Sequence, residues 1–220
     1  MFRLKTQGAI RKGTMQKKLI FLLTFFITNL AFSLEKTSEI SFEKIPYKKS
    51  VKQSILAGDV FSESNVNSFT ENNQKMQSLN FSIAGLHKKN CNYALKTLSN
   101  YEDFSKYIDF IKVSKYNEQT QQLDFILSHL LLPYDMRLMF KLPRVNKIGT
   151  YPFMFEIGIL NGLKGNIHVM EYQNRCLFYS TANWRGPDTG FSNLIFELFS
   201  QALSKISMEV LFRISSTLSH

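Results

Sequence analysis

The segment from Phe191 to Leu211 carries the pattern that most restricts the fold of this chain. Its apolar residues recur at the spacing of one helix face: Phe191, Leu194, Ile195, Leu198, Ala202, Leu203, Ile206, Val210 and Leu211. Phe199 and Met208 widen that face further. A long helix with so broad an apolar face has to pack on a large apolar surface, so the rest of the chain must supply one.

Alternating apolar and polar residues before this helix predict an antiparallel sheet. The first strand begins at Gln77 and alternates through Ile83. Further strands are predicted at residues 110–115, 123–132, 134–141, 151–159, 164–173 and 176–184. The pair Asn161-Gly162 between two of them is a strong hairpin signal. This sheet is the surface on which we expect the long helix to pack.

Between the first two strands the spacing of apolar residues changes. Residues 93–108 follow helical spacing in two short segments, whereas residues 110–115 alternate. Glu102 and Asp103 fall in the first turn of the second short helix, where the helix dipole favours acidic side chains. We therefore interpret the aromatic and charged stretch at 100–117 as a transition from helix to strand and not as a catalytic site.

The chain divides by composition into three parts. Residues 1–33 form a basic and apolar leader. Residues 34–75 form a polar segment leading into the fold, with a short strand near 55–61 and a Ser- and Asn-rich loop at 62–75. Residues 76–218 are expected to form the folded domain.

The leader has the three parts of a secretory signal peptide. A basic stretch precedes an apolar run at residues 19–32, and Ala31-Phe32-Ser33 supplies small residues for cleavage. The run is shorter than the roughly 20 residues of a membrane span. We expect a signal peptide near Met15–Ser33 and an exported protein, periplasmic or secreted. An uncleaved signal anchor is the alternative.

The net charge depends on whether this leader is removed. The whole chain has 27 basic and 17 acidic residues and a net charge of +10. Six of the basic residues and none of the acidic ones precede Leu34, so the mature chain has 21 basic and 17 acidic residues, a net charge of +4. Its basic residues form no patch with interleaved aromatic residues, so we expect no nucleic-acid partner.

The sequence shows no motif of a metal site or a common catalytic site. Cys91 and Cys176 have no nearby histidine with which to complete a tetrahedral zinc site. The four histidines are scattered, at His87, His129, His168 and His220. No Gly-x-Ser-x-Gly elbow, phosphate-binding loop or Gly-x-Gly-x-x-Gly motif occurs. We therefore expect no metal and no cofactor.

The order of these elements resembles the START-like superfamily, also called SRPBCC, which includes polyketide cyclases and coenzyme Q-binding proteins. The resemblance covers roughly Gln77 to Ser216 and is carried by residues 93–104, Leu163-Lys164-Gly165 and Gly186-Pro187. It implies an α+β helix-grip fold, in which a curled antiparallel sheet of about seven strands wraps around a long C-terminal helix. Two short helices would follow the first strand.

The resemblance also implies a cavity between the sheet and the long helix. Family members bind lipids, quinones, sterols or other apolar molecules there, and a few catalyse cyclisation or hydrolysis. The expected lining and ligand-binding residues are Phe140, Phe153, Phe155, His168, Tyr179, Trp184, Leu198, Phe199, Ala202 and Leu203. The alternative is that these residues simply fill a dense core.

A disulfide is a further implication of this resemblance. In the helix-grip arrangement the first and last strands pair antiparallel. Cys91 follows the end of the first strand and Cys176 begins the last, so a bond between them would close a long loop. Two buried, reduced thiols are the alternative.

If the cavity belongs to an enzyme, the best catalytic candidates are Asp124, Arg137, Glu156 and His168. A general acid and base have to meet in space. A two-residue turn at Asn161-Gly162 would place Phe155 opposite His168. Glu156 and His168 would then point to opposite faces of the sheet, unless a one-residue bulge reverses the alternation. We therefore assign no catalytic residue.

From these observations we expect an exported protein that binds an apolar small molecule such as a lipid or quinone, with transient membrane contact as a further partner interaction. A cyclase- or hydrolase-type enzyme in the same cavity is one alternative. A structural or interaction protein with a filled core is the other.

Overall fold

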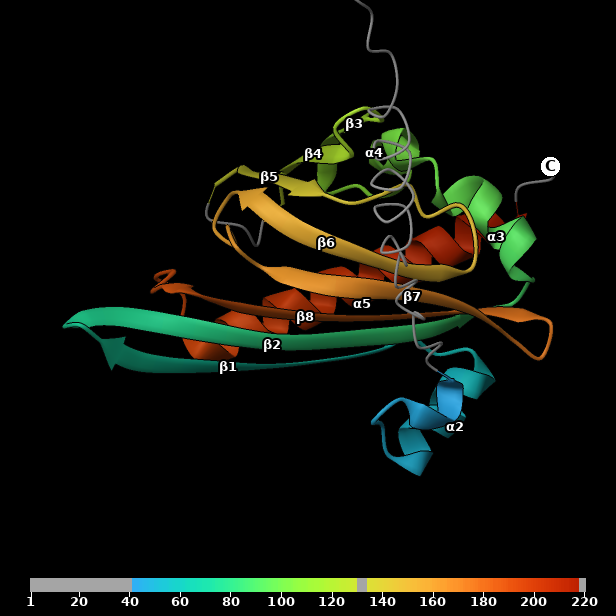
Figure 1. Ribbon diagram of the computed structural model, residues 1–220, viewed down its shortest axis with the longest axis horizontal. Coiled ribbons are helices and arrows are strands. Elements are labelled where there is room, and N and C mark those ends of the chain that lie inside the picture. The colour runs from blue at the N-terminus through green and yellow to red at the C-terminus, as the bar shows by residue number, and fades with distance from the viewer. Residues whose placement is uncertain (1–40, 130–133, 218–220) are drawn as a thin grey trace, which may run out of the picture. The chain divides into compact units, whose positions relative to one another are not determined.

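The computed structural model describes residues 41–129 and 134–217 (Figure 1), so the leader and signal peptide lie outside the described residues. The helices are η1 (Phe42–Lys44), α2 (Lys49–Ala57), α3 (Cys91–Leu98), η2 (Tyr101–Asp103), α4 (Phe104–Tyr107) and α5 (Asn193–Thr217). The strands are β1 (Phe61–Glu71), β2 (Gln74–His87), β3 (Ile111–Asn117), β4 (Gln122–Leu127), β5 (Met136–Lys141), β6 (Gly149–Ile157), β7 (Lys164–Tyr172) and β8 (Arg175–Pro187).

The strands form one 8-stranded antiparallel sheet in the order β1-β2-β8-β7-β6-β5-β4-β3. This order pairs β2 with the last strand, so that Leu79 lies opposite Trp184 and His87 opposite Cys176. The long helix α5 runs across one face of the sheet (Figure 1). The α+β helix-grip arrangement expected from the sequence is confirmed, with one strand more than the expected seven.

The additional strand is β1, and the prediction of a loop at residues 62–75 was wrong. Asn72 and Asn73, both with positive φ, make the tight turn that joins β1 to β2. The sequence of β1 resembles that of a loop because both faces of the strand are polar. On the face toward α5, polar groups of β1 form hydrogen bonds with the helix: Ser62 with Ser204, Ser64 with Ser200, Ser68 with Asn193, and the Val66 amide with Glu197.

The prediction of a short strand near residues 55–61 was also wrong. Residues up to Ala57 belong to α2, which ends at Gly58 with φ of 110°. The strand β1 begins only at Phe61. Ile55 is fully buried, because η1 and α2 pack against the sheet face opposite α5. This second core includes Phe42, Ile45, Tyr47, Ala84, Leu86, Leu177 and Tyr179.

The short helices α3, η2 and α4 lie between β2 and β3, where helical spacing gives way to alternation in the sequence. Asn90 caps α3 by accepting a hydrogen bond from the Tyr93 amide at 2.9 Å. Cys91, the first residue of α3, is joined to Cys176 of β8 by a disulfide with a Cα–Cα distance of 4.5 Å. This is the pair that the family resemblance implies.

Close contact between α5 and the sheet depends on Gly85 of β2. A Cβ atom at Gly85 would lie 2.8 Å from the Phe212 ring and 2.9 Å from the Met208 sulfur. The missing side chain therefore lets the C-terminal half of α5 approach β2. Nearer the start of the helix the sheet is lined by larger side chains, and a cavity separates the two layers.

Candidate ligand cavity

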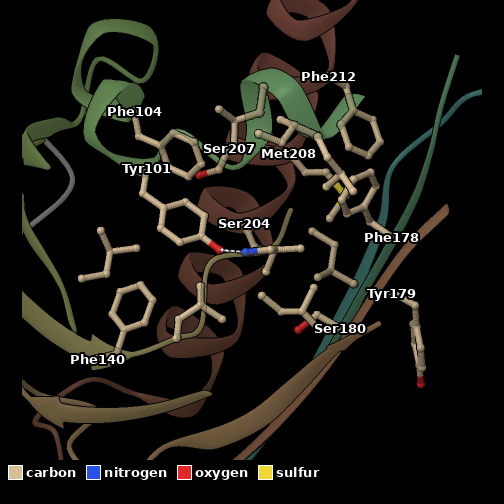
Figure 2. Close-up of a pocket in the computed structure, with 18 of the residues that line it drawn as sticks. Tyr101, Phe104, Phe140, Phe178, Tyr179, Ser180, Ser204, Ser207, Met208 and Phe212 are labelled. Carbon is tan, nitrogen blue, oxygen red and sulfur yellow. Dashed lines mark hydrogen bonds between the residues drawn. The ribbon is translucent and has the colours of Figure 1, made fainter. Parts of the chain in front are cut away.

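A cavity with two adjoining lobes lies between the sheet and α5. The first lobe has a volume of about 360 Å³ and is bounded also by α3, η2 and α4 (Figure 2). The second lobe has a volume of about 320 Å³ and extends to Ile159 and Leu160 in the β6–β7 turn. Four residues belong to the walls of both lobes: Phe125, Phe140, Ser204 and Ser207. Each volume is within the range of roughly 300–1,000 Å³ typical of small-molecule sites.

Aromatic rings make up much of these walls. Phe140 stacks on Phe155 with ring centroids 4.7 Å apart, and Phe125 meets Phe140 edge-on at 5.5 Å. The first lobe adds Tyr101, Phe104, Phe178 and Phe212 (Figure 2). The second adds Phe81, Phe110, Phe153, Phe191, Phe196 and Phe199. Such rings present large, rigid apolar surfaces to whatever occupies the cavity.

None of the described residues that line the two lobes is charged. The α5 serines in the walls already donate their hydroxyl hydrogens to carbonyl oxygens of the same helix. Ser204 donates to Ser200 O at 2.6 Å and Ser207 to Leu203 O at 2.6 Å. The cavity therefore offers an apolar environment with few free polar groups.

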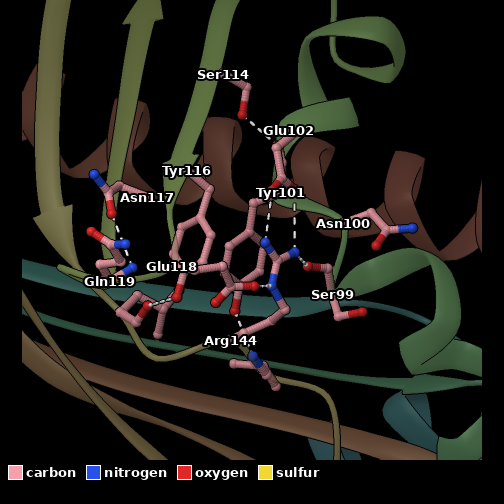
Figure 3. A network of polar contacts seen from close by, with 12 residues as sticks. Ser99, Asn100, Tyr101, Glu102, Ser114, Tyr116, Asn117, Glu118, Gln119 and Arg144 are labelled. Carbon is pink, nitrogen blue, oxygen red and sulfur yellow. Dashed lines mark hydrogen bonds and ion pairs between the residues drawn. The ribbon is translucent and has the colours of Figure 1, made fainter.

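A polar network around Arg144 (Figure 3) lies against Tyr101, which lines the first lobe. The guanidinium pairs with Glu102 at 2.7 Å and also with Glu118. It lies over the ring of Tyr116 at 4.5 Å. The hydrogen bond from Arg144 holds the pKa of the Glu102 carboxyl below its usual range, so the pair stays ionised in neutral solution.

This network fixes the loop before β6 against η2. The Tyr101 hydroxyl donates to Pro143 O at 3.1 Å and accepts from the Val145 amide at 2.8 Å. Burial raises the pKa of Tyr101, so this phenol remains protonated. Because Tyr101, Leu142 and Val145 line the first lobe, these polar contacts determine where its wall lies.

Five of the residues expected in the lining form part of the walls: Phe140, Phe153, Phe155, Phe199 and Leu203. Tyr179 borders the first lobe, but its ring points away from the cavity (Figure 2). It packs instead against Tyr47, with ring centroids 5.9 Å apart, and against His168.

The other four expected lining residues do not line either lobe, which corrects the assignment made from the sequence. Trp184 packs on Phe196 and donates its Nε1 hydrogen to Asn161 O at 2.9 Å. Leu198 and Ala202 lie on the exposed side of α5, with 54% of Leu198 exposed. His168 stacks on Tyr179, which packs against Tyr47 on the sheet face opposite α5.

Strand alternation could have separated Tyr179 from Trp184. The two residues are an odd number of positions apart in β8, so they point to opposite faces of the sheet. The same alternation adds Phe178 and Ser180 to the cavity wall, and both were missed. Ser204 and Ser207 were missed because polar residues on a predicted helix are ordinarily assigned to solvent.

The expected register of the β6–β7 hairpin was wrong. Phe153 pairs with Gly165 and Thr150 with His168, so the connection is longer than a two-residue turn. The observed register differs from the expected one by an odd number of residues. Glu156 and His168 therefore point to the same face of the sheet. Glu156 nevertheless lies six positions along β6 from Thr150, the partner of His168, which corresponds to about 20 Å.

The four catalytic candidates lie outside the cavity walls and have other partners. Asp124 and Arg137 form a bidentate ion pair, with both N–O distances 2.9 Å. Glu156 accepts from Gln122 at 2.8 Å and pairs with Lys141. His168 Nδ1 lies 2.9 Å from the Thr150 hydroxyl, and burial lowers its pKa. These contacts bring no acid and base together on a shared substrate position.

Within residues 41–129 and 134–217, no three His, Cys, Asp or Glu side chains are grouped as metal ligands would be. Over the same ranges, no helix has both the length and the apolar character needed to cross a membrane.

No protein-family model matches the sequence, and no curated protein matches it. Solved structures do match the fold. A conserved protein from Geobacillus kaustophilus has a TM-score of 0.53 and 11% identity over 64% of this chain and 97% of that one. Ara h 8.0201 has a TM-score of 0.51 and 10% identity over 64% of this chain and 99% of that one. These likenesses show the fold alone: the chain has the helix-grip fold of START-like proteins.

Proposed function

We propose that this protein is an exported binding protein that holds an apolar small molecule, such as a lipid or a quinone, between the sheet and α5. The observation that carries the proposal is a cavity of two adjoining lobes with no charged side chain in the described walls. Protein interiors normally contain few voids larger than a water molecule. Lobes of about 320 and 360 Å³ therefore favour a ligand over a filled core.

Two features support the export part of the proposal. The sequence near Met15–Ser33 has the parts of a signal peptide. The disulfide between Cys91 and Cys176 is typical of proteins that reside in an oxidising compartment. An enzyme of cyclase or hydrolase type has no comparable support, because the catalytic candidates are engaged outside the cavity.

Native mass spectrometry of the purified mature chain, followed by solvent extraction, tests the binding proposal directly. We expect an adduct that survives purification and yields a lipid, quinone or similar molecule in the extract. A chain that carries no adduct can be titrated with N-phenyl-1-naphthylamine, an uncharged probe that fluoresces in apolar surroundings. If no adduct is found and the probe does not bind, the proposal is wrong.

A pair of substitutions on α5 locates the binding site. Leu203 lines the second lobe, whereas Leu198 is exposed on the same helix. We expect Leu203→Trp to fill the lobe and weaken binding of the naphthylamine probe about tenfold or more. Leu198→Trp adds the same side chain outside the cavity and should leave the affinity within about twofold of the wild type.

Thermal unfolding of both variants serves as the control for folding. If Leu203→Trp melts normally and still binds the probe as tightly as the wild type does, the probe binds somewhere other than the cavity.

A further inference from the structure

The hydroxyl group of Ser180 differs from the other hydroxyls around the cavity. Ser180 lies on β8, on the side opposite Tyr179, and borders the first lobe (Figure 2). Its neighbours across the sheet are Ile83 on β2 and Ile167 on β7, both of which also line that lobe. Within the described residues, the Ser180 hydroxyl makes no hydrogen bond, and it is not closed off from the cavity.

Tyr179 also borders this lobe, but its ring and hydroxyl point away from the cavity (Figure 2). The hydroxyls of Tyr101, Ser204 and Ser207 already donate within the protein. Tyr101 donates to Pro143 O, and Ser204 and Ser207 donate to carbonyl oxygens of α5. Ser180 is thus the hydroxyl in the first lobe that can both donate to and accept from a bound molecule. A polar group surrounded by apolar side chains gains most from a partner that satisfies it.

The surroundings of Ser180 restrict the charge of that partner. No described side chain of either lobe is charged, so a carboxylate, phosphate or ammonium would lose its hydration without gaining an opposite charge. An uncharged hydroxyl or carbonyl group loses far less and is matched by a single hydrogen bond. The wall therefore selects an uncharged polar group at this position.

The shape of the cavity restricts the rest of the molecule. Phe125, Phe140, Ser204 and Ser207 line both lobes, so the two lobes meet at these four residues. A molecule that has its polar group at Ser180 and also occupies the second lobe would contact Phe140, Phe153 and Phe199. Such a molecule is long and apolar, and it buries additional surface with each carbon that enters the second lobe.

We propose that the ligand is an elongated, uncharged molecule with one hydroxyl or carbonyl group, which forms a hydrogen bond with Ser180, and a hydrocarbon part that occupies both lobes. This inference rests on the proposed binding function and narrows it to a chemical class. Ser180 is the residue that determines specificity for the polar group.

Displacement of bound N-phenyl-1-naphthylamine by three matched molecules tests the class of ligand. Farnesol carries a hydroxyl, farnesoic acid carries a carboxylate at pH 8, and farnesene carries neither. We expect farnesol to bind more tightly than farnesoate by about tenfold or more, because only the carboxylate loses charge hydration. We expect farnesol to exceed farnesene by about three- to tenfold, the contribution of one neutral hydrogen bond.

Substitution of Ser180 tests the residue. Ser180→Ala should lower the affinity for farnesol by about three- to tenfold and leave that for farnesene unchanged. Ser180→Thr, which keeps the hydroxyl, should retain the preference for farnesol over farnesene. Ser207→Ala tests the rival hydroxyl on α5, which lines the lobe but is already donated to Leu203 O. Thr181→Val is the matched control, because it removes a hydroxyl from the next residue of β8, which lines neither lobe.

The outcomes separate this inference from the proposed function. If the naphthylamine probe binds but farnesoate competes as well as farnesol, the uncharged class is wrong. If Ser207→Ala weakens farnesol binding as much as Ser180→Ala does, the polar group is held by α5 and not by Ser180. If geraniol, a shorter alcohol, binds as tightly as farnesol, the ligand does not extend into the second lobe. If neither the probe nor any terpenoid binds, the proposed function itself fails.

Discussion

At the scale of single residues, His87 connects the sheet to the end of α5. Only 1% of it is exposed. Its Nδ1 accepts a hydrogen bond from the Lys89 amide at 3.0 Å and lies 3.3 Å from the Lys89 carbonyl oxygen; the shorter contact favours the tautomer with the proton on Nε2. Nε2 lies 3.0 Å from the hydroxyl oxygens of Ser215 and Ser216 near the end of α5. Burial lowers the pKa of His87 from its ordinary value of 6.5, which favours the neutral imidazole.

This arrangement predicts that acid destabilises the protein. The lowered pKa values of His87 and His168 favour the neutral rings in the folded state, whereas the unfolded chain takes up protons near pH 6.5. The stabilising contribution is therefore present above pH 6.5 and is lost as the pH falls through that value toward the folded-state pKa. Urea unfolding between pH 8 and pH 5 should show a decreasing free energy of unfolding.

Substitution of each histidine serves as the control for this prediction. In His87→Gln the decrease between pH 8 and pH 5 should be smaller, and His168→Gln should remove a separate part of it. A variant series in which the pH dependence is the same as in the wild type would rule out both histidines as the cause.

At the scale of elements, the polar contact between β1 and α5 limits what can be read from the sequence. The serines of β1 bond to Asn193, Ser200 and Ser204 of α5, on a helix whose other sides carry apolar residues. A strand that buries hydroxyl groups has the composition of a loop, so β1 could not be found by apolar alternation. The broad apolar face of α5 could be predicted because buried apolar residues recur with a helical period in the sequence. Hydroxyl groups that pair with one another produce no such period.

The disulfide is the second feature at this scale. It joins the start of α3 to the start of β8 across a sequence separation of 85. In the chain-entropy description, closing a loop of that length stabilises the fold by about 4–5 kcal/mol at most. We expect the Cys91→Ala/Cys176→Ala variant to unfold at a markedly lower urea concentration than the oxidised wild type.

Thiol alkylation followed by mass spectrometry provides the control, because the oxidised protein should take up no reagent until it is reduced. If the variant unfolds at the same urea concentration as the wild type, the bond contributes no stability.

At the scale of the whole molecule, the two faces of the sheet have different roles. The face toward α5 encloses the cavity, and the opposite face is partly covered by η1 and α2. Burial of the second face explains why the alternation in β2 is incomplete, since Ala84 and Leu86 are as buried as Ile83. A polar segment before a domain is usually interpreted as a linker, yet Phe42, Ile45 and Ile55 belong to this core.

The export proposal belongs to this scale as well. We expect expression of the full sequence in a bacterium to yield a periplasmic product that lacks residues 1–33, because the leader has the parts of a cleaved signal peptide. Intact mass measurement of the periplasmic and membrane fractions tests this. A product of full length that stays with the membrane would favour the signal anchor instead.

Much of the fold was predictable because its main elements have periodic apolar faces. The long helix, most strands of the sheet and the change from helix to strand near residue 110 all follow from such periodicity. Assigning the aromatic residues of β7 and β8 to the cavity required knowledge of which sheet face lies toward α5, because both faces are buried. His168 was placed in the cavity wall wrongly because it lies on the face opposite α5, with Tyr179. Trp184 was placed there wrongly because it packs on Phe196 of α5 instead of lining either lobe.

The sequence by itself determined that a broad apolar helix would pack on an antiparallel sheet, because the helical and strand periods of apolar residues depend only on neighbouring positions in the chain. Only the tertiary structure decided the register of the β6–β7 hairpin, the partners of the β1 serines and the position of Ser180 beside the cavity. These depend on pairings between residues far apart in the chain. Hydrogen bonds between such residues leave no period in the sequence, so the chemistry of the cavity could be inferred only after the fold was known.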